Sequence, residues 1–369
     1  MSQSNSDIAL FLSSLDGGGA HKMMIQIAKG LSKSGYNVDL VVIKERGPLI
    51  DMVPQEVDLV TLKSGRALTS WLSLIKYLDI NEPKAMLATP VTTTLPAVWA
   101  KILSPVDFKL VLRIPVVLSQ TQFHTNPHGN KDRLLPHLIK LFYPHADEYI
   151  AISQGVADDL KTTFGISSRN INTIYNPAVD DHVMTQKNDD VEHRFFEEPY
   201  PVLLGVGRLT EQKDFTTLIE TFDKLTDDID ARLIILGEGE KRNELTSLIQ
   251  SKGLSNKVSM PGYVKNPFPY MKQADVFVLS SAWEGFGNVI PEALACGTPV
   301  VSTDCKSGPR EILDHGKYGE LVDVGDSEAL AKSINKALTK DADENRLIER
   351  SMEYHIDNIV PKYESVLVE

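Results

Sequence analysis

Apolar positions along the chain follow two different periods in turn. Short, continuous apolar runs such as 274–279 are typical of strands that are buried on both faces of a parallel sheet. Between these runs the apolar residues recur at helical spacing: Met24, Ile27 and Leu31 share one face of a helix predicted over 21–34. The repeated exchange of strand and helix predicts an α/β protein built from doubly wound parallel sheets.

The predicted elements form two groups. The predicted strands of the first group are 8–13, 38–43, 85–88, 109–112 and 148–152, and Ser153 is the predicted N-cap of a helix after the last of them. The predicted strands of the second group are 202–206, 232–236, 257–260, 276–279, 299–302 and 320–322, with helices over 215–225 and 240–251. Between the groups, residues 180–200 are polar and charged without apolar periodicity, and we interpret them as a linker or exposed loop.

This organisation predicts a first domain over 1–177, a second over 178–345, and a C-terminal helix over 346–369. A chain of 369 residues favours two cores over one. Its 42% hydrophobic and 24% charged residues are those of an ordinary globular protein. The polar start lacks the features of a signal peptide, and no run approaches the roughly 18 apolar residues of a membrane span. Two cysteines, Cys296 and Cys305, make no disulfide framework, so we expect a reduced, cytoplasmic protein.

The net charge of −12 is unevenly distributed. Residues 1–180 hold 17 Lys and Arg against 16 Asp and Glu, whereas the remainder holds 21 against 34. Residues 101–145 hold six basic and two acidic residues. An acidic chain with one basic segment argues against nucleic-acid binding but allows docking on an anionic surface. Within that segment, 131–142 mixes basic with large apolar residues, which suits either a membrane headgroup region or a helix with its apolar face in the core.

The richest candidate chemistry lies in residues 283–292. A glycine turn, Gly285 to Gly287, follows the predicted strand 276–279 and opens a short helix. Backbone N–H groups at such a turn suit an anion, while the carboxylates of Glu284 and Glu292 can accept hydrogen bonds from sugar hydroxyls. Donors for phosphate beside acceptors for hydroxyls indicate a nucleotide sugar.

Two further Gly-x-Gly turns, at 205–207 and 237–239, follow predicted strands. Neither has the third glycine of a dinucleotide-binding fingerprint, and each can also be interpreted as an ordinary tight turn. Their strands would end at the same edge of one parallel sheet, where ligands bind. Arg208 and Lys213 come just after the first turn and are candidate cations for a diphosphate, with plain surface solvation as the alternative.

These motifs resemble those of the retaining glycosyltransferases with the GT-B fold, of the family 4 type. The resemblance rests on Asp16-Gly17-Gly18-Gly19-Ala20, Gly205-Val206-Gly207-Arg208-Leu209 with Lys213, Leu236-Gly237-Glu238-Gly239, Pro261-Gly262-Tyr263-Val264 and the pair Glu284 and Glu292, which seven residues separate. They occur in the family's order and span residues 8 to 325, nearly the whole chain. The resemblance implies two Rossmann-like domains facing a central cleft, with a last helix that crosses back to the first domain.

The resemblance also implies the site residues. Arg208, Lys213 and Glu284 would be catalytic, with Glu284 near the donor sugar and Glu292 on the ribose. The donor-binding set would be Gly18, Gly19, Gly207, Arg208, Lys213, Glu238, Tyr263, Val264, Glu284, Gly285, Phe286, Gly287, Asn288, Val289 and Glu292. On the acceptor side the family's polar run after strand 109–112 is replaced by Arg113-Ile114-Pro115-Val116-Val117. Arg113 and His124 are the remaining acceptor-side candidates, and an exposed loop histidine is the alternative for His124.

The activity implied by the resemblance is transfer of a sugar, with retention, from a nucleotide diphosphate donor, UDP by preference. The acceptor would be a hydroxyl of a glycan or lipid-linked sugar, in the synthesis of a cell-surface polysaccharide or glycoconjugate at the inner face of the membrane. We expect no essential metal, because no Asp-x-Asp pair stands at a strand end. A nucleotide-sugar epimerase on the same scaffold and a non-catalytic sugar-nucleotide-binding protein remain as alternatives. The missing fingerprint disfavours an NAD oxidoreductase.

Overall fold

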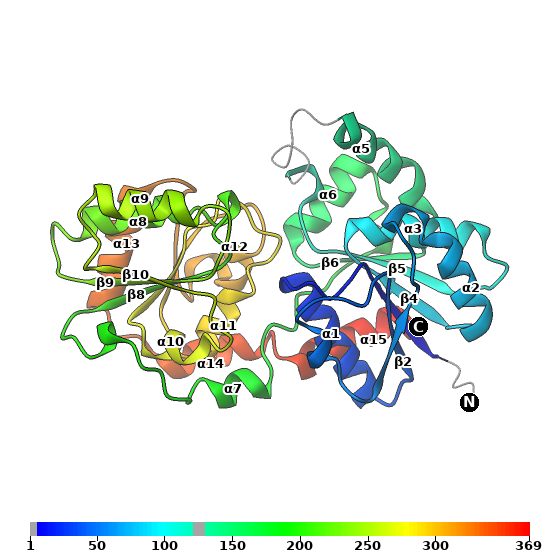
Figure 1. Ribbon diagram of the computed structural model, residues 1–369, viewed down its shortest axis with the longest axis horizontal. Helices are drawn as coiled ribbons and strands as arrows, with labels where there is room; N and C mark the ends of the chain where they lie inside the picture. The colour runs from blue at the N-terminus through cyan, green and yellow to red at the C-terminus, as the bar shows by residue number, and fades with distance from the viewer. Residues whose placement is uncertain (1–5, 121–129) are drawn as a thin grey trace. The chain divides into compact units, whose positions relative to one another are not determined.

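The computed structural model describes residues 6–120 and 130–369, and only the backbone of 130–133. Contacts between residues divide the chain into two compact units (Figure 1). Unit 1 comprises Met1–Pro177 and Ile356–Glu369, and unit 2 comprises Ala178–His355. The terminal helix α15 (Ile356–Val368) therefore belongs to unit 1, while the helix before it, α14 (Glu344–Met352), belongs to unit 2.

Unit 1 is built on a seven-stranded parallel sheet in the order β3-β2-β1-β4-β5-β6-β7. Its strands are β1 (Ile8–Leu12), β2 (Val38–Val42), β3 (Val57–Thr61), β4 (Ala85–Ala88), β5 (Lys109–Ile114), β6 (Glu148–Ala151) and β7 (Ile171–Thr173). Every residue of β1, β2 and β4 is buried, because helices cover both faces of the sheet. This explains why these strands appear in the sequence as continuous apolar runs.

The helices of unit 1 are α1 (Gly19–Lys33), α2 (Trp71–Asn81), α3 (Val91–Leu103), α5 (Asn130–Phe142), α6 (Gln154–Phe164) and α15. Helices α1 and α15 pack in the same core cluster, with Ile27 and Leu31 of the first near Ile359 and Tyr363 of the second. They approach so closely that a Cβ added to Gly30 would lie 2.4 Å from a methyl group of Val360. Tyr36 then donates a hydrogen bond of 2.8 Å to Glu364. The chain thus returns to unit 1 through α15, which packs tightly against α1.

Unit 2 is built on a six-stranded parallel sheet in the order β10-β9-β8-β11-β12-β13. The strands are β8 (Val202–Val206), β9 (Arg232–Leu236), β10 (Val258–Gly262), β11 (Val276–Leu279), β12 (Val300–Thr303) and β13 (Glu320–Val322). The helices are α7 (Asp181–Gln186), α8 (Phe215–Leu225), α9 (Arg242–Ser251), α10 (Phe268–Gln273), α11 (Val289–Ala295), α12 (Pro309–Ile312), α13 (Ser327–Thr339) and α14. Apolar residues of α8, α9 and α13 form one core cluster with the sheet, and α10, α11 and α14 lie on its other side (Figure 1).

The interpretation of residues 180–200 as a linker or exposed loop is wrong for 181–186, which form α7, whereas most side chains of 187–200 are exposed or half-buried. Asp180 caps α7 by accepting a hydrogen bond of 3.1 Å from the backbone N–H of Val183. Phe195 is fully buried, and Glu198 forms an ion pair of 2.6 Å with Arg232. A few isolated side chains hold the segment in place, and it has no periodic apolar face. The pattern of apolar and polar residues therefore did not predict its structure. Strands β3 and β7 were not predicted either, because one is partly exposed and the other has three residues.

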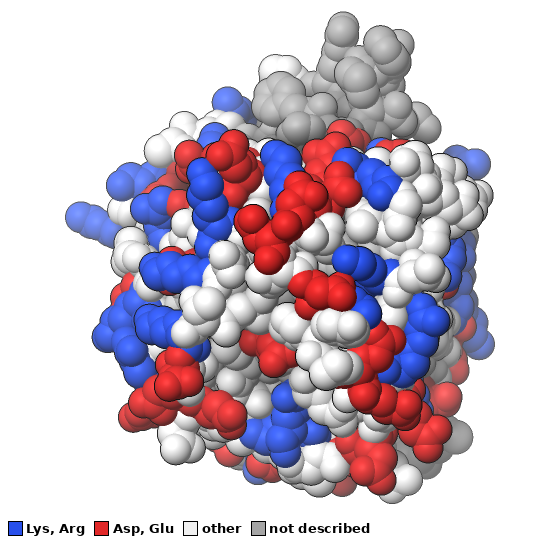
Figure 2. All heavy atoms as spheres, turned by 90° about the vertical axis from the view of Figure 1, so that its left-hand side faces the viewer, with Lys and Arg blue, Asp and Glu red and all other residues white. Residues whose placement is uncertain are grey.

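The charges are mixed on the face of the molecule that Figure 2 shows. Figure 2 shows a face on which acidic and basic side chains lie beside one another, without a large area of one sign. Pairs of this kind in unit 2 include Lys252 with Asp223, 2.6 Å apart, and Lys332 with Glu328, 2.8 Å apart. Such pairs neutralise part of the negative charge in the second half of the chain, where acidic residues are in excess.

Candidate active site

The predicted site residues of unit 2 gather where its sheet changes winding direction. From β8 the chain continues to β9 and β10 on one side, whereas β11, on the other side of β8, is followed by β12 and β13. The loops after β8 and β11 therefore part to opposite sides at the carboxyl ends of the strands, which is where ligands bind in open parallel sheets. Arg208 and Lys213 follow β8, and Glu284 and Glu292 follow β11.

Lys213 and Glu284 form an ion pair at this point. The Nζ atom of Lys213 lies 2.5 Å from Oε1 of Glu284, and the two side chains are only 15% and 8% exposed. The loop between β8 and α8 presents the lysine because Asp214 takes a left-handed conformation, φ 43°, and caps α8 through the N–H of Thr217. The structure thus brings together a cation and a carboxylate separated by 71 positions in the sequence.

Three further side chains hold Glu284. Ser281 donates a hydrogen bond of 2.7 Å to Oε1, and the amide of Gln212 lies 3.5 Å from Oε2. The hydroxyl of Ser307 donates to the carbonyl of Glu284 at 2.8 Å. These residues come from the loops after β11, β8 and β12, so three strand ends hold Glu284, two through its carboxylate and one through its backbone carbonyl.

The glycine turns after β8 and β9 interlock. A Cβ on Gly237 would lie 1.9 Å from the carbonyl oxygen of Gly207, and Gly237 has φ 143°, so no other residue fits there. The N–H of Gly207 donates to Leu236 at 3.0 Å, and that of Gly237 donates to Gly262 at 2.8 Å. Three adjacent loops therefore form one backbone surface beside Lys213, whose side chain packs 3.0 Å from the Cβ position of Gly207.

The turn after β11 is similarly constrained. Gly287 has φ 93° and its carbonyl accepts the N–H of Ile290 at 2.9 Å, which starts α11. Glu292 lies in the first turn of that helix and is 7% exposed. Phe286 is buried and packs edge-to-face on Tyr354, with 5.6 Å between the ring centroids. Gly285, Asn288 and Val289 complete the turn.

The other predicted donor residues of unit 2 stand around this centre. Arg208 is exposed, and its side chain makes no hydrogen bond or ion pair with the part of the chain that the structure describes. Glu238 instead pairs with Arg242 at 2.9 Å. Tyr263 is 77% exposed and Val264 is half-buried, just beyond the end of β10. The two candidate cations thus differ: the side chain of Arg208 is exposed, whereas that of Lys213 is paired with Glu284.

In unit 1, Gly18 and Gly19 begin α1 directly after β1. Gly18 has φ 95° and no side chain caps the helix. Asp16 is held by Ser14, 2.6 Å away, and by Arg46, 2.7 Å away, and these contacts keep the pKa of its carboxyl below the usual range. His124 lies outside the described residues.

The structure places Arg113 differently from the acceptor-side position predicted for it. Its side chain is fully buried at the end of β5. It donates hydrogen bonds to Oη of Tyr363 on α15, at 3.1 Å, and to Oδ1 of Asn176, at 2.6 Å. The side chain is buried because position 113 of β5 faces the side of the sheet that α15 covers. Arg113 serves the packing of unit 1 rather than an exposed acceptor.

Sequence reasoning missed Gln212, Ser281 and Ser307. Their signal was weak, because single polar residues after a strand are common in any α/β protein. Two of them stood near a motif, Ser281 three residues before Glu284 and Gln212 directly before Lys213. Cys305 also lies beneath the site, donating to the carbonyl of Ser281 at 3.1 Å, and burial raises the pKa of its thiol to about 12.

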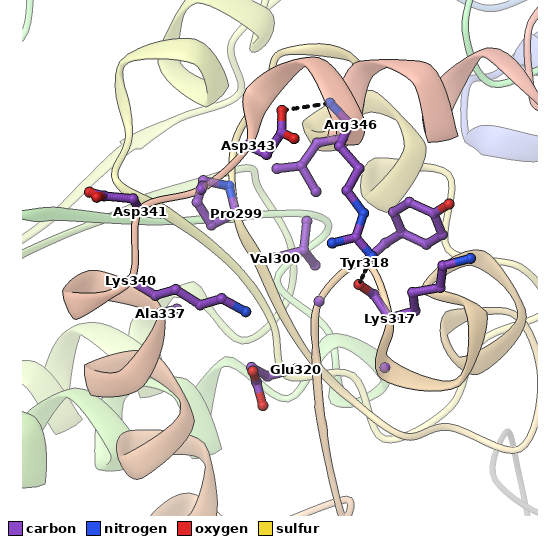
Figure 3. Close-up of a pocket in the computed structure, with 14 residues that line it drawn as sticks. Pro299, Val300, Lys317, Tyr318, Glu320, Ala337, Lys340, Asp341, Asp343 and Arg346 are labelled. Carbon is purple, nitrogen blue, oxygen red and sulfur yellow. Dashed lines mark hydrogen bonds between the residues drawn. The ribbon is translucent and has the colours of Figure 1, made fainter.

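A cavity of about 160 Å³ lies elsewhere in unit 2, at the amino ends of β12 and β13 (Figure 3). Lys340 and Arg346 line it together with Glu320, Asp341 and Asp343. Arg346 lies over the ring of Tyr318, 5.0 Å from its centroid, and its Nη2 donates to the carbonyl of Lys317 at 3.2 Å. Because this cavity is at the opposite edge of the sheet from Lys213 and Glu284, it is separate from the candidate site.

Over residues 6–120 and 130–369, no group of three or more His, Cys, Asp or Glu side chains is arranged to hold a metal ion. In the same residues, no helix has both the length and the apolar character needed to cross a membrane.

Residues 17–182 match the family described as Glycosyltransferase Family 4, and residues 186–354 match the family described as Glycosyl transferases group 1. The chain belongs to the group 1 glycosyl transferases, of the family 4 type. The family resemblance expected from the motifs is therefore confirmed.

Two curated relatives of this glycosyltransferase illustrate its neighbourhood. It is 37% identical over 204 residues to N-acetylgalactosamine-N,N'-diacetylbacillosaminyl-diphospho-undecaprenol 4-alpha-N-acetylgalactosaminyltransferase of Campylobacter jejuni, covering 55% of this chain and 54% of that one. It is 40% identical over 153 residues to the lipopolysaccharide core biosynthesis glycosyltransferase LpsE of Rhizobium meliloti, covering 42% and 44%. The chain spans about half the length of the curated relatives it matches.

Solved structures share the fold over nearly the whole chain. Anabaena Alr3699/HepE in complex with UDP matches with a TM-score of 0.77 and 21% identity, covering 98% of this chain and 99% of that one. The apo form of the lipopolysaccharide outer core galactosyltransferase WaaB matches with a TM-score of 0.76 and 20% identity, covering 97% and 98%. The prediction of a GT-B fold with two Rossmann-like parts is confirmed.

Proposed function

We propose that this glycosyltransferase transfers a sugar, with retention, from a UDP-sugar to a hydroxyl of a lipid-linked glycan in cell-surface glycoconjugate synthesis. The observation that carries the proposal is the buried pair of Lys213 and Glu284, 2.5 Å apart, at the point where the sheet changes winding direction. A cation for a diphosphate and a carboxylate for a sugar hydroxyl stand side by side there, as a nucleotide sugar requires.

The residues divide the donor between them. Arg208 and Lys213 bind the diphosphate, Glu284 accepts a hydrogen bond from the sugar, and Glu292 accepts one from the ribose. The backbone of 285–289 contributes N–H donors to phosphate or sugar oxygens. Tyr263 and Val264 line the base through main-chain atoms, and Glu238 stands beside them.

The chemical step needs no protein nucleophile. The acceptor oxygen forms a bond to the anomeric carbon, and the bond from that carbon to the phosphate oxygen breaks. The leaving diphosphate takes the acceptor's proton, and Arg208 and Lys213 stabilise the charge that develops on it. Attack and departure on the same side of the sugar give retention.

The names of the relatives support the choice of substrates. The Campylobacter jejuni relative is named for an acceptor linked to diphospho-undecaprenol. The structure of Anabaena Alr3699/HepE was obtained with UDP. We therefore infer UDP as the nucleotide and a polyprenyl-linked or lipopolysaccharide-type glycan as the acceptor class.

Exposed apolar residues on unit 1 support contact with a membrane that carries such an acceptor. On α5, Ile139 is fully buried, but Leu134 and Leu141 are 59% and 64% exposed. On α3, which contacts α5 through Trp99 and Phe142, Leu103 is 57% exposed. We propose that this surface rests on the anionic inner face of the cytoplasmic membrane, with Lys140 and His137 among the headgroups.

A donor panel tests the proposed function. UDP-glucose, UDP-galactose, UDP-N-acetylglucosamine and UDP-N-acetylgalactosamine are incubated with the protein, with and without undecaprenyl-diphosphate-linked saccharides, and released UDP is measured. We expect release from one donor to rise strongly with an acceptor. Conversion of a donor to its epimer without acceptor would replace the proposal by an epimerase, and absence of UDP binding would refute it.

A further inference from the structure

The two carboxylate oxygens of Glu284 have different surroundings. Oε1 accepts from Lys213 at 2.5 Å and from Ser281 at 2.7 Å. Within the described residues, Oε2 has only the amide of Gln212, at the long distance of 3.5 Å. An ionised carboxylate offers about four acceptor positions, two on each oxygen. One oxygen is therefore occupied and the other is largely free.

Burial makes this difference significant. Glu284 is only 7% exposed, so water at the surface satisfies little of Oε2. A buried carboxylate oxygen without good donors is unfavourable unless a ligand supplies them. The donor groups of a sugar are its hydroxyls, which are of the right kind to fill the free positions of Oε2.

Ser281 is itself held firmly. It is fully buried, and its carbonyl oxygen accepts hydrogen bonds from Thr303 at 2.6 Å and from Cys305 at 3.1 Å. The carbonyl of Glu284 is bound in turn by Ser307. The hydroxyl of Ser281 therefore meets the carboxylate from a fixed position, and it limits rotation of the Glu284 side chain about its last bond.

We propose that Ser281 is a positioning residue that selects between the two oxygens of Glu284. By engaging Oε1 together with Lys213, it directs Oε2 toward the donor, where Oε2 accepts a hydrogen bond from a hydroxyl of the transferred sugar. Ser281 does not touch the donor. It determines how well the enzyme distinguishes a UDP-sugar from UDP. This inference rests on the proposed function and assigns the sugar contact of that site to one atom.

Binding measurements with Ser281→Ala test the inference. Titration calorimetry gives the dissociation constants of UDP and of the four UDP-sugars for the parent and the variant. We expect UDP affinity to stay within about twofold, while the preference for the best UDP-sugar over UDP falls about tenfold, since a misplaced carboxylate loses its contact. Ser281→Cys, which keeps a weak donor, should fall between the two.

Ser351→Ala is the matched control. Ser351 is also fully buried in unit 2, and its hydroxyl bonds only a backbone carbonyl, that of Ile348, at 2.6 Å. It should lower stability about as much as Ser281→Ala without changing the preference. If Ser281→Ala keeps the parent's preference, or loses UDP and UDP-sugar affinity equally, the inference is overturned. A parent protein that binds none of the five compounds would instead refute the proposed function.

Discussion

Each of the two sheets has a largely buried cation at or just beyond the carboxyl end of a strand, Arg113 in unit 1 and Lys213 in unit 2, and the two have different partners. In unit 1, Arg113 is fully buried and bonds two neutral groups, Tyr363 and Asn176, and it forms no ion pair within the described residues. In unit 2, Lys213 is paired with the carboxylate of Glu284, and the two side chains are 15% and 8% exposed. The first cation fastens the returning helix α15 and the segment before the second unit. Under the proposed function, the second cation also binds the donor diphosphate, so we expect the two cations to differ in what their removal changes.

The largest expected effect is that of Lys213→Ala. Removing the cation should weaken UDP binding and slow transfer, because a charged hydrogen bond to a diphosphate contributes on the order of 2–4 kcal/mol. Calorimetry with UDP and the donor assay measure both. Lys332→Ala, which removes a lysine that is 76% exposed and paired on α13, should change neither. Parental UDP binding by Lys213→Ala would show that the comparison between the two cations is wrong.

Arg113→Met should act on stability instead. The substitution leaves Tyr363 and Asn176 without their buried donor, which costs roughly 2–3 kcal/mol. We expect a lower midpoint of thermal unfolding and unchanged UDP affinity at temperatures where the variant is folded. Arg169→Met removes an exposed arginine of unit 1 and should leave both unchanged. A loss of UDP affinity in the folded Arg113→Met protein would assign the residue to the site after all.

Substitutions of Glu284 and Glu292 should have different effects on UDP affinity in the same assay. Glu292→Ala should weaken UDP and UDP-sugar alike, by about 1–2 kcal/mol, because it removes an acceptor from the ribose. Glu284→Gln should bind UDP at least as tightly as the parent, since Lys213 loses its charged partner, but it should turn over slowly. Calorimetry with UDP alone distinguishes them. Equal losses of UDP affinity would contradict the division of roles.

The smallest expected effect concerns the surface of unit 1. Each basic residue near an anionic membrane contributes roughly 1 kcal/mol, so attachment through α5 should be weak and sensitive to salt. Leu141→Glu should reduce co-sedimentation with vesicles of phosphatidylglycerol and phosphatidylethanolamine at low salt. Ile80→Glu, at a residue of α2 that is 61% exposed, is the matched control. A parent protein that stays in the supernatant would favour a soluble acceptor.

Much of the architecture could be read from local patterns. Strands such as β8 and β11 are buried on both faces, so continuous apolar runs gave their bounds, and the glycine turns after them were visible because strained backbone requires glycine. Residues 180–200 escaped, since Phe195 and Val183 are isolated anchors without a period. The sequence also could not separate Arg113 from Lys213, as both are cations that follow or end a predicted strand.

The sequence by itself determined the family, the alternation of strands and helices, and the residue types of the candidate donor site, because these depend on short-range spacing. Tertiary structure alone decided which side chains meet. Lys213 reaches Glu284 only because β8 and β11 are neighbours in the sheet although β9 and β10 separate them in the chain. Arg113 turns inward only because α15 returns to the face that this position occupies. Pairing of strands and docking of helices are long-range events, and no local pattern of apolar and polar residues specifies the partner that a side chain will find.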